Sequence, residues 1–139
     1  MALKASGLKV GDTHSERVAE NISRTQLVQY AGASGDYNPL HTDEVYTVQA
    51  AGYKSVFAHG MLTMGLTGKM LTNYVGDGRL TKFGVRFTNQ VWPGDTLDSK
   101  ATVTAIRDEG GHKVADLAIS TTNQDGKEVV SGTATARLD

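Results

Sequence analysis

Two side chains that can transfer protons stand close together near residue 40, on a loop that a proline constrains. Asp36 and His41 are five positions apart, and Asn38-Pro39 between them cannot continue a helix. A carboxylate and a neutral imidazole on one rigid loop can hold a water molecule, with one group accepting a proton and the other donating one. The spacing alone also fits an Asx-turn at Asp36 beside a surface histidine, with no chemistry at all.

The segments on either side of this loop are predicted to be helical. Ser23 can cap a short helix that runs through Tyr30, with Gly32 just past its end. Residues 43–50 are predicted to form a second helix, which Gly52 stops. These two helices would hold the Asp36 loop between them.

The longest predicted helix spans residues 60–75. Its apolar side chains occupy nearly every face of the helix, which indicates that the helix is buried. Gly65 and Gly68 lie on one face, where we expect a neighbouring backbone to come close. Three of its methionines (Met61, Met64 and Met70) have the spacing of core residues, and methionine also suits the wall of an acyl tunnel.

The second half of the chain alternates apolar and polar residues, the pattern of half-buried strands. Four strands are predicted, over residues 80–91, 97–105, 114–122 and 130–138. Short turns join them, with Asp125-Gly126 as the clearest hairpin signal. The result is an antiparallel meander. One buried helix and one such sheet predict the α+β class, with the sheet wrapped around the helix.

Composition narrows the function further. The 139 residues suit one domain, and 14 basic against 15 acidic residues give a net charge of −1. A near-neutral chain is a poor partner for nucleic acid or an anionic membrane surface. The chain contains no cysteine, which excludes disulfides, thiolate metal sites and cysteine nucleophiles. We find no signal peptide and no membrane span, so we expect a cytoplasmic protein without membrane insertion.

The full string around the dyad resembles a family motif. Residues 35–41, GDYNPLH, match the G-D-x-N-P-[LIV]-H motif of the MaoC-like dehydratases, also called (R)-specific enoyl-CoA hydratases or hydratase 2. Residues 57–62, FAHGML, look like the A-H-G-M segment that opens the family's central helix. FGVRF at 83–87 and VWPGDTL at 91–97 are similar to its strand and P-G-D-T turn. The pattern is also similar to the catalytic subunit of (3R)-hydroxyacyl-ACP dehydratases, and no motif position departs from it.

The resemblance implies a fold and a role for each motif residue. The fold is a single hotdog domain over residues 1–139, an antiparallel β-sheet wrapped around a central α-helix. Asp36 and His41 form the hydratase dyad, and either of them is the base that activates water. Asn38 orients the loop and holds His41 or the water. The backbone N–H of Gly60 binds the thioester oxygen.

The implied reaction is the reversible hydration of a trans-2-enoyl thioester to the (3R)-hydroxyacyl thioester, in fatty acid metabolism. The partner is the acyl thioester of coenzyme A or acyl carrier protein. No metal and no cofactor is expected, because the thioester carbonyl itself acidifies C2. The resemblance also implies a homodimer, or a heterodimer with another hotdog subunit.

Two other functions fit a chain of this fold. One is an acyl thioesterase, in which Asp36 would direct water at the carbonyl carbon. The other is a non-catalytic subunit that binds acyl thioesters, although such a subunit has no need of both dyad groups. Among the remaining histidines, His59 adjoins the start of the long helix and is interpreted as structural, while His14 and His112 are expected on the surface. A metal site made of Asp36, His41 and His59 does not match a known ligand spacing.

Overall fold

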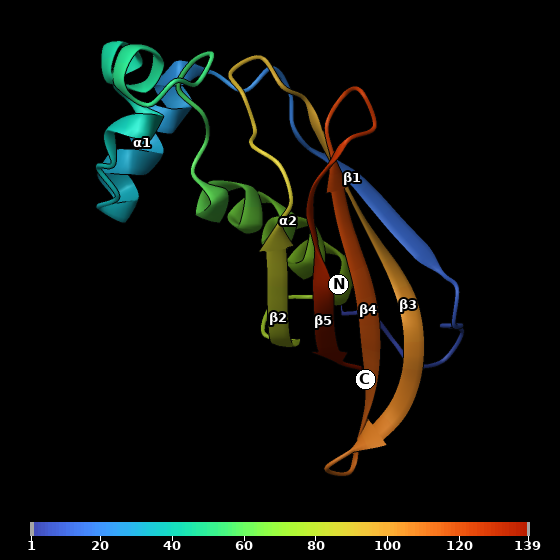
Figure 1. The fold of residues 1–139 in the computed structure, drawn as a ribbon. Helices are drawn as coiled ribbons and strands as arrows, with labels where there is room; N and C mark the ends of the chain where they lie inside the picture. The colour runs from blue at the N-terminus through green and yellow to red at the C-terminus, as the bar shows by residue number, and fades with distance from the viewer. Residues whose placement is uncertain (1, 139) are drawn as a thin grey trace.

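The computed structural model describes residues 2–138 and contains one antiparallel sheet, one long helix and a smaller helical region (Figure 1). The elements in chain order are β1 (Thr13–Ala19), α1 (Arg24–Ser34), the 3₁₀ turn η1 (Pro39–His41), the π-helical turn η2 (Tyr46–Ala50), α2 (Gly60–Val75), β2 (Leu80–Phe87), β3 (Leu97–Glu109), β4 (His112–Thr122) and β5 (Glu128–Arg137). The α+β class and the sheet that curves around a helix are thereby confirmed.

The order of strands in the sheet is β1-β3-β4-β5-β2. The meander prediction is right for β3, β4 and β5 but wrong for β2, which pairs with β5. Residues 88–96 do not form a hairpin: the Val91 carbonyl accepts from Ala58 N–H and Gly94 N–H donates to the Ile22 carbonyl, so the chain leaves β2 instead of turning back. The strand predicted over residues 80–91 accordingly ends at Phe87.

β1 is a strand that the sequence pattern does not predict. Its sequence, THSERVA, has little apolar alternation, and none of its residues is fully buried. Backbone pairing with β3 forms it, with Thr13 opposite Thr102 and Arg17 opposite Asp98. Tertiary pairing overrides the weak local signal here.

The first helix begins where predicted and ends later. Ser23 caps α1, its Oγ accepting from Gln26 N–H at 3.0 Å. Gly32 lies inside the helix, and Gly35 at φ 75° ends it in the left-handed conformation that glycine adopts at low cost. The helix predicted over residues 43–50 is confirmed in the main, since residues 44–50 are helical and the π-helical turn η2 makes up 46–50. Figure 1 shows α1 and these turns projecting to one side of the sheet.

Helix α2 has the predicted bounds and lies across the concave face of the sheet. Met70, Leu71 and Val75 are fully buried against the apolar face of β3, β4 and β5. The other face is open, since Met61 is 56% exposed and a methyl group at Gly65 would meet no described atom within 4 Å outside the backbone of its own helix. The prediction of a close backbone at both glycines is wrong, because Gly68 faces the Phe83 ring.

A chain of three buried hydroxyl groups links α2 to the sheet. Ser99 and Thr121 lie opposite each other on β3 and β4, with their oxygens 2.6 Å apart, and Thr121 Oγ1 lies 2.7 Å from Thr67 Oγ1. Thr67 donates to the Thr63 carbonyl at 2.9 Å. From Ser99 to Thr63, each hydroxyl proton has an acceptor, which is how buried hydroxyls avoid the cost of desolvation.

Within residues 2–138, no helix has the length and apolar character needed to cross a membrane. The cytoplasmic location stays a prediction.

Candidate active site

The structure brings the two predicted dyad residues together at the η1 turn, which Asp36 precedes and His41 ends. His41 Nε2 lies 3.9 Å from Asp36 Oδ2. This gap is too long for a direct hydrogen bond, and one water about 2.8 Å from each atom would fill it. The His41 side chain is 11% exposed and that of Asp36 is 53% exposed, so the imidazole is enclosed while the carboxylate remains open to solvent.

A backbone carbonyl determines the tautomer of His41. Nδ1 lies 2.7 Å from the carbonyl oxygen of Phe57, which can only accept, so Nδ1 carries the hydrogen. In the neutral ring Nε2 then holds a lone pair directed toward Asp36. Burial lowers the pKa of His41 below its ordinary value, an effect that outweighs the Phe57 hydrogen bond and the Asp36 charge. Neutral His41 and ionised Asp36 thus present two acceptors, which match the two O–H bonds of one water.

Asn38 shapes the loop through three backbone contacts. Its Oδ1 accepts from Leu40 N–H at 3.0 Å and caps the η1 turn, while its own N–H donates to Asp36 Oδ1 at 3.2 Å. Its carbonyl oxygen accepts from the His41 N–H at 3.1 Å. Asn38 thereby connects both dyad residues through the backbone and one carboxylate oxygen.

The extended segment before α2 connects the dyad loop to the helix. Phe57 N–H donates to the Leu40 carbonyl at 3.2 Å, and Ala58 N–H donates to the Val91 carbonyl at 2.8 Å. At the start of α2 the first intrahelical donors are Leu62 and Thr63, both to the His59 carbonyl. The N–H of Gly60 precedes them and belongs to the unpaired first turn, at the positive end of the helix dipole.

A cavity of about 300 Å³ opens beside Gly60. Its walls come from the start of α2, the end of β2 and its following loop, and β5; they include Phe57, Gly60, Thr63, Phe87 and Val130. Asp36 and His41 are not among the lining residues of this cavity in the described chain, but Phe57 links the two, since it lines the cavity and accepts from His41. Phe57 is thus the residue shared by the cavity at Gly60 and the predicted dyad.

His59 is the third titratable group at the site, and it is almost fully buried. Its Nε2 donates to the Asp36 carbonyl at 3.0 Å, and its ring stacks on His41 with centroids 3.8 Å apart and planes 25° apart. Asp36, His41 and His59 each have a ligand atom within 4.8 Å of the others. The carbonyl bonds use His41 Nδ1 and His59 Nε2, so His41 Nε2 and His59 Nδ1 are the nitrogens that this cluster could offer to an ion.

Two features of this site were not predicted from the sequence. Phe57 orients His41 through its carbonyl, and a backbone acceptor has no signal in residue type. The contact of His59 with both dyad residues is the second, although its place in the A-H-G-M segment was an available signal. The two histidines predicted to lie on the surface differ from each other: His112 is exposed, whereas His14 stacks on Tyr74 and bonds Glu16 at 2.8 Å.

Over most of its length, the chain is similar to a protein-family model, to named relatives and to solved structures. The family model described as MaoC like domain matches residues 6–125. The (R)-specific enoyl-CoA hydratase of Rhodospirillum rubrum is 33% identical over 131 residues, covering 93% of this chain and 88% of that protein. The unliganded R-hydratase PhaJ1 of Pseudomonas aeruginosa superposes with a TM-score of 0.86 at 29% identity, over 99% of this chain and 86% of that one. The hotdog fold expected from the sequence is confirmed.

Other relatives are much longer than this chain. The 3-hydroxyacyl-thioester dehydratase Y of Mycobacterium tuberculosis is 34% identical over 91 residues, which are 63% of this chain but 31% of that protein. The chain spans at most 31% of the length of the first three curated relatives it matches.

Proposed function

This chain belongs to the MaoC-like domain family, and on that premise we propose that it is an enoyl-thioester hydratase that uses Asp36 and His41 as its catalytic dyad. The substrate is a trans-2-enoyl thioester of coenzyme A or acyl carrier protein, and the product is the (3R)-hydroxyacyl thioester. In the reverse direction the same site dehydrates the hydroxyacyl thioester.

The proposal depends above all on one observation, the pair of acceptors that face each other across 3.9 Å. A water between His41 Nε2 and Asp36 Oδ2 donates one O–H to each. As its oxygen bonds to C3 of the substrate, one of the pair takes a proton. The electron pair of the C2=C3 bond moves toward the thioester carbonyl, and a proton is then returned from the pair to C2. One water enters, every atom of it remains in the product, and the dyad ends in its starting state.

The enolate formed after water adds needs a hydrogen-bond donor at the thioester oxygen. The Gly60 N–H is suited to this, since it opens α2, lines the 300 Å³ cavity and lies at the positive end of the helix dipole. A glycine admits the substrate close to the backbone, because a Cβ here would lie 3.1 Å from the Phe87 ring and narrow the cavity.

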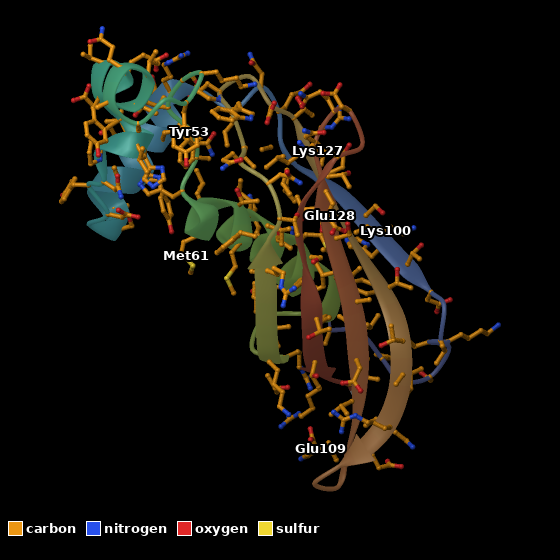
Figure 2. The ribbon with its side chains drawn as sticks, in the orientation of Figure 1. Tyr53, Met61, Lys100, Glu109, Lys127 and Glu128 are labelled. Carbon is orange, nitrogen blue, oxygen red and sulfur yellow. The ribbon has the colours of Figure 1, made fainter. Side chains whose placement is uncertain are left out.

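The open edge of β2 supports a dimer as the active form. β2 is at the end of the sheet, and exposed apolar side chains lie beside it, with Phe87 49% exposed and Met61 56% exposed. Figure 2 shows Met61 pointing outward from the first turn of α2. Covering this edge with a second hotdog subunit would remove an aggregation-prone strand edge and enclose the cavity at Gly60.

The decisive experiment follows a trans-2-enoyl-CoA by ultraviolet absorbance. Hydration removes the absorbance of the conjugated enoyl thioester without releasing a thiol, and chiral analysis of the product identifies the (3R) isomer. Release of coenzyme A thiol would instead show a thioesterase. Binding of the substrate with neither change would show a non-catalytic subunit. The same assay with the enoyl group on acyl carrier protein distinguishes the two carriers.

A further inference from the structure

We propose that His59 is a positioning residue for the dyad, which holds the Asp36 backbone through its Nε2–H and covers the face of the His41 ring. The proposal rests on the proposed function of Asp36 and His41. It assigns a specific task to a residue that the sequence alone presented as structural.

The first contact attaches Asp36 to a distant part of the chain. Asp36 N–H donates to Ser34 Oγ at 3.2 Å, and its Oδ1 accepts from Asn38 N–H, so both of these hydrogen bonds stay within residues 34–38. The bond from His59 Nε2 to the Asp36 carbonyl, 3.0 Å long, comes from 23 residues further along, at the start of α2. It anchors the loop end after Gly35 to the longest helix of the fold.

The second contact encloses His41. The rings of His59 and His41 stack at 3.8 Å, while the Phe57 ring meets His41 edge-on at 5.4 Å. Both rings exclude water from the imidazole. Burial is the main cause that lowers the pKa of His41. A neutral His41 keeps its Nε2 lone pair for the water.

An unpaired nitrogen makes His59 a costly residue to bury if it only filled space. The residue is 1% exposed, and its Nδ1 is buried without a hydrogen-bond partner in the described part of the chain. A buried lone pair without a partner costs free energy, which an apolar ring of similar shape would avoid. The contribution that distinguishes the imidazole from such a ring is its Nε2–H. The edge of Tyr30, with its centroid 4.9 Å away, adds a further contact that restrains the ring.

Among the described residues, few charged or titratable groups lie near His41. Asp36 faces it from the loop, His59 from the start of α2, and the phenol of Tyr30 packs on His59 from α1. Lys54 lies over Trp92, which in turn contacts Phe57, so two aromatic rings separate this cation from His41. Changes at position 59 therefore act on His41 with Asp36 as the nearest charge.

Two substitutions separate the two contacts. His59→Phe keeps a ring on His41 and removes the hydrogen bond to Asp36. His59→Gln keeps an amide N–H able to reach the Asp36 carbonyl and removes the ring. His59→Ala removes both, and His112→Gln is the matched control at an exposed histidine. Thermal unfolding of each variant shows that it is folded.

We expect His59→Phe to lower kcat by roughly 10- to 100-fold with little change in KM, because a displaced Asp36 misaligns the water. His59→Gln should keep kcat within a few-fold of wild type at pH 8. The acid limb of its kcat/KM profile should move to higher pH, since water reaching His41 raises its pKa. A His59→Phe variant as active as wild type would overturn the positioning role. If His59→Phe does not fold, equal turnover of His59→Ala and His59→Gln at pH 8 would do the same.

A measurement on the free protein, without substrate, tests the role of His59 independently of the proposed reaction. Imidazole ¹H–¹⁵N NMR of the free protein follows the titration of His41 directly. We expect the His41 midpoint to rise in His59→Gln and to stay near that of wild type in His59→Phe and His112→Gln. An unchanged midpoint in His59→Gln would overturn the covering role, even if the wild type hydrates its substrate. Wild-type protein without hydratase activity would overturn the reaction alone, because the NMR result does not depend on it.

Discussion

His41 donates its Nδ1–H to the carbonyl oxygen of Phe57 over 2.7 Å, and this bond selects the nitrogen that faces Asp36. The same Phe57 residue is part of the cavity wall that continues to Gly60. The orientation of the imidazole and the shape of the proposed oxyanion site thus depend on one short extended segment.

Removing either dyad group should abolish most of the activity of a folded protein. We expect Asp36→Asn and His41→Ala each to lower hydratase turnover by about 10²–10⁴-fold, the usual contribution of a positioned acid–base group. The loss is measured by enoyl-CoA absorbance, with circular dichroism to verify the fold. Near-normal turnover in either variant would show that the dyad is assigned to the wrong residues.

Activity should fall on the acid side as His41 gains a proton. Burial holds its pKa below the ordinary 6.5, so Nε2 keeps its lone pair to a lower pH than an exposed histidine would. The acid limb of kcat/KM is therefore expected below pH 6.5. A limb at or above that value would contradict the neutral, enclosed imidazole.

The same group should make stability depend on pH. The folded-state pKa of His41 is depressed, so the unfolded chain takes up its proton first as the pH falls. Its contribution to the free energy of unfolding is complete above about pH 6.5 and is lost as the pH falls through the folded pKa. Urea unfolding at pH 7.5 and pH 5 measures this, and His41→Gln should reduce the difference between the two values. If the free energy of unfolding changed equally between the two pH values in wild type and in His41→Gln, His41 would not be the source of the pH dependence.

Gly60 and Gly65 make a matched pair on one helix. A methyl at Gly60 would lie 3.1 Å from the half-exposed Phe87 ring, which can shift, so Gly60→Ala should change the melting temperature little while lowering turnover strongly. The methyl of Gly65→Ala would meet no described atom of its own chain outside the helix backbone, so this variant should raise helix stability by up to about 1 kcal/mol. A Gly60→Ala protein that loses stability but keeps its activity per folded molecule would make Gly60 a purely structural residue.

The buried hydroxyl chain should behave as a unit. Thr121→Val removes the acceptor of Ser99 and the donor to Thr67, so we expect the free energy of unfolding to fall by about 1–3 kcal/mol. Thr121→Val leaves the Ser99 hydroxyl with only the 3.4 Å contact to Thr67 Oγ1, so adding Ser99→Ala should cost less than the sum of the two single changes. Urea titrations of the three variants give the coupling, and strict additivity would mean that the groups act separately.

A charge on the open face of α2 should separate the subunits of the proposed dimer. Met61→Asp places a carboxylate where the first turn of α2 meets the uncovered edge of β2, whereas Val10→Asp places one at a similarly exposed apolar residue just before β1. Sedimentation should show a monomer with reduced turnover for Met61→Asp and a dimer for Val10→Asp. A wild-type protein that is monomeric and fully active would contradict the dimer.

The local signals in this sequence predict elements well where side chains determine them. Helix α2 has its predicted bounds, and Ser23 is the cap of α1 as expected, because capping and apolar content are properties of the residues themselves. The dyad loop is recognisable because residues 35–41, GDYNPLH, match a family motif, whereas the spacing of Asp36 and His41 alone also fits a turn without chemistry. What the sequence does not show depends on partners distant in the chain. β1 forms by pairing with β3, β2 crosses to β5, and His41 is oriented by a backbone carbonyl that any residue at position 57 would supply.

The pairing of β2 with β5 bears on how the protein is made. β2 leaves the ribosome well before β5, so it lacks its pairing partner while synthesis continues. Val130 of β5 lies opposite Phe87 and completes the wall of the cavity at Gly60, so the cavity cannot form until the last strand has been translated. A nascent chain that stops before β5 would present an unpaired β2 to chaperones and proteases, and quality control would act on it before it could bind any substrate.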